Sequence, residues 1–135
     1  MATFNKFNAF VEAVAEKKHD LGSDQLVVAL TNSAPVAATN AILADITEIS
    51  YANCSSRNIT TTSSSQTGGT YSLVLEDLTL TASGGDVGPF RYAVTYNDDA
   101  TNDDLICWHD YGESITVHDG ETFKVDFGDN ILTLQ

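Results

Sequence analysis

The sequence predicts a mainly β protein: a single-domain β-sandwich or open β-barrel with one N-terminal α-helix. Three observations predict this fold. Apolar residues recur at helical spacing only near the N-terminus, short apolar or alternating runs follow closely from residue 23 onward, and turn-forming residues separate these runs. Because 135 residues suit one compact domain, we expect residues 1–22 to form a helical arm and residues 23–135 to form the β-domain.

The N-terminal segment has the spacing of an amphipathic helix. Apolar side chains recur every three or four residues, and so lie on one helical face, at Phe4, Phe7, Phe10 and Val14. Thr3 is the expected N-cap. Gly22 is the expected terminator, because it follows a basic stretch that suits the C-terminal end of a helix.

Residues 25–70 predict strands of three different characters. Gln25–Thr31 is a continuous apolar run typical of a buried strand, and a loop containing Pro35 follows it. Residues 42–50 alternate between apolar and polar side chains, which predicts a half-buried strand. The Ser/Thr-rich residues 58–70 fit either an exposed edge strand ending in a Gly-Gly turn or a flexible loop.

The second half of the chain has the clearest β pattern. Residues 71–82 form an apolar run with an expected kink at Glu76-Asp77, and Phe90–Tyr96 alternates along its length. An acidic loop, residues 97–104, comes next. The remaining expected strands are Leu105–Tyr111, Ser114–Val117, Thr122–Phe127 and Asn130–Leu134. Between two of these, Asp119-Gly120 predicts a two-residue hairpin.

Charge excludes several partners. The chain carries 19 Asp and Glu against 6 Lys and Arg, a net charge of −13, and thirteen of the acids lie in residues 76–135. Such a surface repels nucleic-acid phosphates and anionic membranes. The longest apolar runs are too short to span a bilayer, and the N-terminus lacks the apolar segment of a secretory signal peptide. We therefore expect no direct nucleic-acid or membrane partner.

The acidic loop is the best candidate for a metal site, although a weak one. Its side chains Asp98, Asp99, Asp103 and Asp104 supply the oxygen ligands that Ca²⁺ prefers. The EF-hand pattern fails in two registers: counted from Asp99, Asp104 stands where the loop requires glycine, and counted from Asp98, His109 stands where it requires glutamate. The alternative is a solvated hairpin tip that binds no metal.

Other chemistry-bearing residues do not form a recognisable catalytic pattern. His109 and His118 each precede an aspartate, but neighbours in a strand point to opposite faces. His19 lies near the end of the predicted helix, and no nucleophile-elbow or zinc-protease motif occurs. Cys54 and Cys107 are either free or joined in a disulfide. We therefore predict that the protein is not an enzyme and needs no cofactor.

Aromatic side chains on the strands beside the acidic loop have two interpretations. They are Tyr92, Tyr96, Trp108 and Tyr111. They either pack in the core or present exposed rings on which a sugar can stack.

Seven segments spread over nearly the whole chain carry a resemblance to a known family: Phe4–Glu12, Leu21–Asp24, Val28–Pro35, Ala44–Ile49, Ala82–Val94, Trp108–Gly112 and Asp119–Phe127. They resemble a family of small virion structural proteins of tailed bacteriophages. The chain differs from that family in a shortened stretch at residues 53–57 and a short end at residues 126–132, which look like loop changes. The family offers no catalytic motif to carry over.

The resemblance implies a capsid decoration, or cement, protein. Such a protein binds the outer face of the major capsid protein and stabilises the head, and we expect it to act as a homotrimer. Its expected location is the capsid surface of the virion, and the host cytoplasm before assembly. The expected contact residues are Phe4, Lys6 and Phe7 in the helix, with Asn58, Thr60 and Thr62 on a polar edge. The alternative is a tail- or fibre-associated module that binds host glycan through Trp108, Tyr111 or Tyr96.

Overall fold

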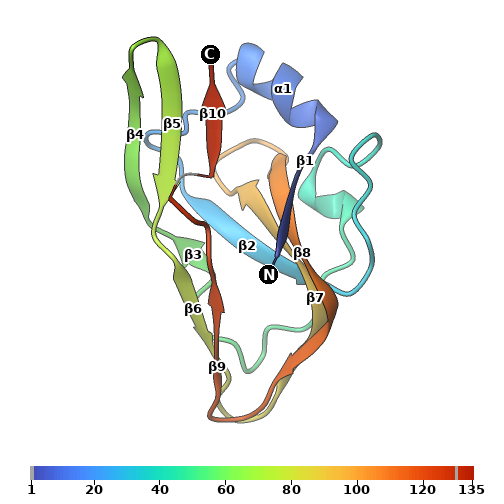
Figure 1. Ribbon diagram of the computed structural model, residues 1–135. Helices are drawn as coiled ribbons and strands as arrows, with labels where there is room; N and C mark the ends of the chain where they lie inside the picture. The colour runs from blue at the N-terminus through green and yellow to red at the C-terminus, as the bar shows by residue number, and fades with distance from the viewer. Residues whose placement is uncertain (1, 130) are drawn as a thin grey trace.

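A computed structural model of the chain describes residues 2–129 and 131–135. Antiparallel strands form two facing layers with helix α1 at one end, which confirms the mainly β, sandwich-like fold (Figure 1). The sheets do not close into a barrel. Among the described residues, no helix has the length and apolar character needed to cross a membrane.

The first layer is a five-stranded antiparallel sheet in the order β1-β8-β7-β2-β3. Its strands are β1 (Thr3–Lys6), β2 (Leu26–Thr31), β3 (Asn58–Ile59), β7 (Val87–Asn97) and β8 (Leu105–Val117). The long hairpin of β7 and β8 forms the centre of this sheet and runs almost the length of the molecule (Figure 1). Because β2 is buried along its whole length, the predicted buried strand at residues 25–31 is confirmed.

The second layer is a bent antiparallel ladder in two parts. Its upper part in Figure 1 has the order β10-β5-β4 and its lower part pairs β6 with β9. The strands are β4 (Thr61–Thr67), β5 (Thr70–Leu75), β6 (Leu78–Thr81), β9 (Thr122–Val125) and β10 (Leu132–Leu134). The ladder is interrupted at the predicted kink. There the Asp77 carboxylate accepts the Phe127 N–H at 3.0 Å and lies 3.6 Å from the Lys124 ammonium.

One continuous apolar core joins the two layers. Its fully buried side chains come from both sheets and include Leu26, Val28, Leu30, Leu73, Leu80, Phe90 and Val125. The connection from β2 to β3 packs further apolar side chains against this core, on the opposite side of the molecule from β4 and β5 (Figure 1). The sandwich is therefore covered on both faces of its main sheet.

The N-terminal segment departs from the predicted helix. Residues 3–6 form strand β1, paired with β8 from Thr3↔Asp110 to Lys6↔Cys107, and α1 spans only Asn8–Ala15. The N-cap is Phe7, so the predicted Thr3 cap is wrong. The physical reason is the edge of β8, whose backbone donors and acceptors are satisfied by pairing with β1. This pairing outweighs the helical preference that the spacing of the aromatic residues indicates.

Helix α1 ends at Ala15, and the residue that terminates it in the left-handed conformation is Lys17, not the predicted Gly22. Lys17 adopts φ 67°, the Lys18 N–H donates to the Ala13 carbonyl at 2.9 Å, and the Lys17 N–H donates to the Val14 carbonyl at 3.3 Å. This double hydrogen bond is a Schellman motif with a lysine at the left-handed position, where glycine is usual.

Lys17→Gly should therefore raise the free energy of unfolding by roughly 0.5–1 kcal/mol, because glycine adopts positive φ without the penalty of a Cβ. Urea unfolding measures this gain. Lys18→Gly is the matched control: it removes the same charge one residue on, at negative φ, and should be neutral or destabilising. A gain in the control equal to that of Lys17→Gly would show that charge, and not backbone conformation, is responsible.

Two further predictions are wrong. Residues 42–50 form no strand beyond a single bridge at Ile42, because the Asp45 carboxylate accepts the N–H groups of Ala41 and Ile42 and closes the short 3-10 helix Leu43–Asp45. Residues 118–121 do form a turn, but not a hairpin. Since β8 pairs with β1 and β7 while β9 pairs with β6, this turn carries the chain from one layer to the other.

Candidate functional site

The six predicted contact residues do not come together. Phe4 and Lys6 lie on β1, at one end of the five-stranded sheet. Asn58 lies on β3 at the opposite end, and Thr60 and Thr62 follow it toward and into β4. The Ser/Thr-rich segment therefore forms strands β3 and β4 instead of a flexible loop, and β4 lies at the edge of the second layer.

Phe7 is excluded as a contact residue. Its side chain is 0% exposed and its ring centroid lies 4.6 Å from that of Trp108. The prediction is wrong because Phe7 is the residue where strand β1 turns into helix α1, so its side chain fills the core beneath that junction.

The β1 edge is open. The Phe7 N–H donates to the Ile106 carbonyl at 3.2 Å, in register with the β1–β8 pairs. Because hydrogen-bonded pairs alternate along an antiparallel ladder, Thr3 and Asn5 bond to β8, and the backbone groups of Phe4 and Lys6 point away from it. The Phe4 side chain is 42% exposed, with its ring 5.6 Å from that of His109. This edge therefore offers backbone donors and acceptors beside an exposed aromatic ring.

The other side of the sheet is closed by the chain itself. The Val28 N–H donates to the Arg57 carbonyl at 3.0 Å, and Arg57 Nη1 donates to the Val28 carbonyl at 2.6 Å. The Tyr51 hydroxyl accepts the Leu30 N–H at 2.8 Å, and the Arg57 guanidinium lies 3.6 Å from the centroid of the Tyr51 ring. These contacts complete the pairing of β2 beyond the short strand β3, which protects this edge from association.

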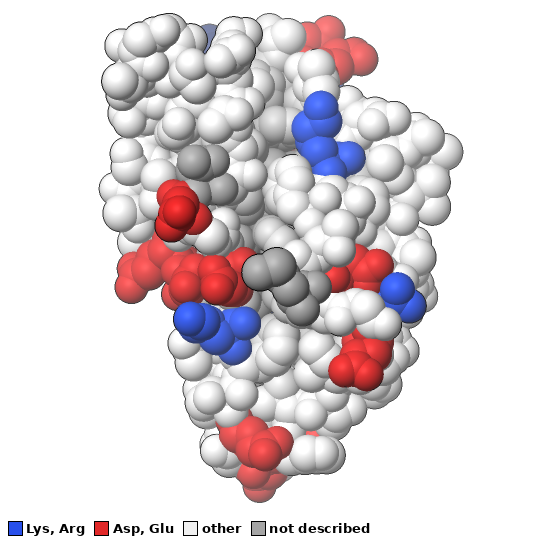
Figure 2. Space-filling model, in the orientation of Figure 1, with Lys and Arg blue, Asp and Glu red and all other residues white. Residues whose placement is uncertain are grey.

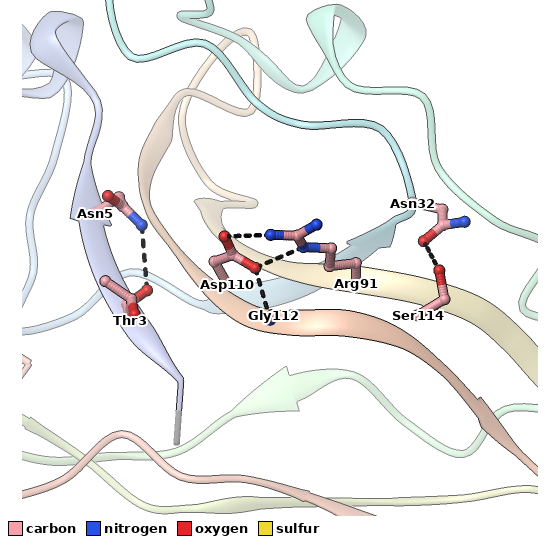
Figure 3. Close-up of polar contacts among 7 residues, drawn as sticks. All are labelled: Thr3, Asn5, Asn32, Arg91, Asp110, Gly112 and Ser114. Atoms are coloured by element: carbon pink, nitrogen blue, oxygen red, sulfur yellow. Dashed lines mark hydrogen bonds and ion pairs between the residues drawn. The ribbon is translucent and has the colours of Figure 1, made fainter.

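Beside β1, the outer face of the sheet carries a fixed ion pair (Figure 3). Arg91 Nε and Nη2 donate to the two oxygens of Asp110 at 2.9 and 3.2 Å, and the Gly112 N–H donates to the same carboxylate at 2.8 Å. The Arg91 hydrogen bond is the main cause that holds the pKa of Asp110 below its ordinary value. Ser114 donates to Asn32 at 2.8 Å alongside. The groups satisfy one another, so this surface is a structural clamp across β7 and β8.

The four candidate calcium ligands do not converge. Asp99 Oδ2 already accepts the Gln25 N–H at 2.7 Å, and Asp98 is exposed. Asp99 and Asp104 border one cavity, whereas Asp103, at φ 53°, borders a different depression. No group of three or more His, Cys, Asp or Glu in the part of the chain that the structure describes is arranged to hold a metal ion. The geometry favours the solvated hairpin tip.

Divalent cations should therefore stabilise the protein only by screening. Figure 2 shows Asp and Glu side chains in several separate groups on one face, as expected for a chain of net charge −13. Thermal unfolding at matched ionic strength should give nearly equal midpoints in NaCl, MgCl₂ and CaCl₂. A gain of several degrees in CaCl₂ alone, lost in Asp99→Asn/Asp103→Asn, would instead establish a calcium site.

The predicted sugar-stacking platform is not exposed. Trp108 and Tyr92 are each 8% exposed and Tyr96 is 5% exposed. Tyr111 is mostly buried, and burial raises its pKa. The core interpretation of these aromatic residues is therefore correct: the Trp108 ring packs against Phe7, and the Tyr111 ring packs against Phe123 of β9.

The two cysteines and the histidines of β8 and the following turn are not arranged as catalytic groups. Cys54 and Cys107 are both free, and burial raises the pKa of the Cys107 thiol to about 12, which makes it unreactive. His109 is buried beneath Phe4, and burial lowers its pKa. His118 is exposed and lies 3.2 Å from Asp86, so the neighbouring aspartates do not form dyads with these histidines.

A polar network at the loop end of the β7–β8 hairpin was not predicted from the sequence. Asn97, which is 0% exposed, donates through Nδ2 to Asp24 at 2.7 Å and contacts His19 Nδ1 at 3.0 Å. Asp104 is 8% exposed beside this network. The one sequence feature that could have indicated this network is Asn97, a polar residue at the end of a long apolar strand.

Together these features define a sandwich-like, mainly β protein with an open N-terminal edge strand and a polar cavity at one end. No protein-family model matches the chain, and no curated protein or solved structure is significantly similar to it.

Proposed function

We propose that this protein is a capsid decoration protein of a tailed phage, which binds the major capsid protein and stabilises the head. The sequence resemblance supplies the class of protein. The structural observation that supports it best is the open β1 edge, where the backbone of Phe4 and Lys6 is free to pair with another chain.

The contact is an added strand. A strand of the major capsid protein pairs with β1 through backbone hydrogen bonds, and the Phe4 ring packs against it. β1 carries a basic residue, Lys6, and no acidic one, in a chain whose net charge is −13. Lys6 therefore lowers the repulsion that an acidic lattice surface would meet at this edge.

Stabilisation follows from mass action. A protein that binds the expanded lattice, and not its opened form, raises the free energy of opening by an amount that grows with its concentration. Three copies around a junction between capsomers, the homotrimer expected from the resemblance, place three β1 edges on the lattice at once, which raises the effective affinity.

The test compares heads with and without the protein. Heads lacking it should show missing density on the capsid surface in a cryo-electron reconstruction and should lose resistance to heat and osmotic shock. Adding the purified protein back should restore both. Unchanged heads, or labelling of tails by an antibody to the protein, would overturn the proposal.

The mode of contact has its own test. Phe4→Pro removes an N–H that points away from β8, so the fold should persist. Binding to stripped heads should fall about tenfold or more, the loss expected for one hydrogen bond and an aromatic contact. Val11→Ser is the matched control, since Val11 is 55% exposed on α1 away from the edge. Equal binding by the two variants would exclude β1 as the contact.

The glycan-binding alternative has no comparable support. Its expected ring-stacking residues Trp108 and Tyr96 are buried, so the decoration role is the one we propose.

A further inference from the structure

A cavity of about 760 Å³ lies where three parts of the chain meet. Its walls are the segment after α1 (residues 17–24), the β7–β8 hairpin loop (residues 99–104), and the end of the second layer that holds Ser64, Tyr71 and Leu134. This cavity is separate from the open β1 edge, so a ligand bound in it is independent of the proposed capsid contact.

Asp104 is the unusual group in this cavity. It is 8% exposed, and its backbone is engaged, since its carbonyl accepts the Asn97 N–H at 3.0 Å. Within the described residues no side-chain hydrogen bond reaches its carboxylate, whose oxygens are not among the fully buried unpartnered atoms and so open onto the cavity. Carboxylates on residues this enclosed are usually paired. The Asp104 carboxylate is therefore available to a donor that enters the cavity.

The neighbouring Asn97 amide, by contrast, is already held by hydrogen bonds. Asn97 Oδ1 accepts the Asp99 N–H at 2.9 Å, which fixes the orientation of the amide. Its two Nδ2 hydrogens then point to Asp24 Oδ2 at 2.7 Å and to His19 Nδ1 at 3.0 Å. His19 Nδ1 is therefore an acceptor and the ring is neutral in this arrangement, with its hydrogen on Nε2, which has no hydrogen-bond partner among the described residues. Burial lowers the pKa of His19, and the nearby Asp104 and Asp24 carboxylates oppose that fall.

The charges and the apolar walls of the cavity define the ligand. Four carboxylates border it against two ammonium groups, from Asp20, Asp24, Asp99 and Asp104 and from Lys17 and Lys18. Apolar side chains complete the walls, namely Val14, Leu21, Tyr71 and Leu134. A cationic head on an aliphatic stem satisfies both kinds of surface.

A metal ion fits this arrangement less well than an organic cation does. Within the described residues no three acidic, His or Cys side chains converge on one point, as a metal would require. An alkylammonium needs only one charged acceptor and can point its other N–H groups at carbonyl oxygens or water.

We propose that this cavity binds an alkylammonium group, the chemistry of a lysine side chain, with Asp104 as its ion-pair partner. The aliphatic stem lies along the Leu134 and Tyr71 side of the opening, and the acidic groups that the chain already holds in place contribute their field without moving.

The experiment is an NMR titration of the whole protein with n-butylammonium chloride, with tetramethylammonium chloride at equal ionic strength as the control for screening. Saturable shifts at the amides of His19 and Asp104 are expected with n-butylammonium alone. Asp104→Asn should weaken binding about tenfold or more, the effect of losing one charge-assisted hydrogen bond. Asp98→Asn, an exposed carboxylate of the same hairpin, should leave it nearly unchanged.

A second pair of variants tests the proposal even if Asp104→Asn does not fold. Lys18→Gln removes a positive charge at the rim and should tighten binding, whereas Lys6→Gln on β1 should not. Equal affinity of wild type, Asp104→Asn and Lys18→Gln, or no saturable shifts with n-butylammonium, would overturn the proposal.

The source of the cation is distinguished by two further ligands. A lysine blocked at its amino and carboxyl groups that binds as well as n-butylammonium indicates a side chain of a partner protein. A linear diamine that binds much more tightly than blocked lysine indicates a free polyamine. Failure of both, with n-butylammonium also inactive, would show that the cavity does not select ammonium groups.

Discussion

Phe10→Ala should lower the free energy of unfolding by about 3–5 kcal/mol, the range for truncating a buried phenylalanine. Phe10 is 2% exposed, belongs to the continuous core, and lies with its ring centroid 5.3 Å from that of His19. The α1 backbone, held at its start by the Asn8 N–H bond to the Ala37 carbonyl at 3.0 Å, cannot easily collapse into the space left behind. Urea unfolding monitored by Trp108 fluorescence measures the loss.

Val11→Ala is the matched control, because Val11 is the next residue of α1 and is 55% exposed. It should change stability by no more than about 0.5 kcal/mol. If the two variants unfold at the same urea concentration, α1 does not pack on the sandwich in solution. The N-terminal segment would then be a free arm, able to order on a partner.

The strands of the core could be predicted because their signal is local. A continuous apolar run marks β2, and alternation marks β7, so burial and strand period agree within a few residues. The kink between β5 and β6 was also predictable, since Glu76-Asp77 places two charges in an apolar run. Each of these features depends on side chains that are neighbours in sequence.

The N-terminus could not be predicted, because its signal is not local. The spacing of Phe4, Phe7 and Phe10 fits a helix, yet Thr3–Lys6 pairs with residues more than a hundred positions away in β8. A similar limit applies to residues 42–50, where alternation is present but a partner strand is not, and Asp45 instead closes a turn. Pairing decides between strand and turn in both places, and pairing is a property of the fold.

The polar cavity could not be predicted from the sequence, because the aspartates of the hairpin loop are not distinguishable there. Asp98, Asp99, Asp103 and Asp104 look alike in sequence, whereas in the structure Asp98 is exposed, Asp99 caps the start of β2 and Asp104 is buried. What separates them is the position of each residue in the hairpin loop relative to the segment after α1, which only the folded chain brings near. The predicted contact residues Phe4 and Phe7 also look alike in sequence, but the fold places Phe4 on an open edge and Phe7 in the core.

Gly88→Ala should be among the most destabilising single substitutions, with a loss of about 3 kcal/mol or more, because backbone strain contributes about 1–2 kcal/mol and forced repacking about 1–3 kcal/mol. Gly88 has φ +125°, and a Cβ there would lie 2.7 Å from the Ile115 carbonyl oxygen and 3.2 Å from the Thr116 Cα. Both atoms belong to the backbone of β8, so relief requires β7 and β8 to separate where their register already shifts, between Val87 and Phe90.

Gly112→Ala is the matched control for Gly88→Ala. Gly112 also lies in β8 at positive φ, +83°, but a Cβ added there would have no atom within 4 Å, so this variant should lose only the strain contribution of about 1–2 kcal/mol. Urea unfolding of both variants separates the steric cause from the conformational one. Equal losses of stability in the two variants would show that the hairpin accommodates the extra carbon. Backbone conformation alone would then explain why position 88 requires glycine.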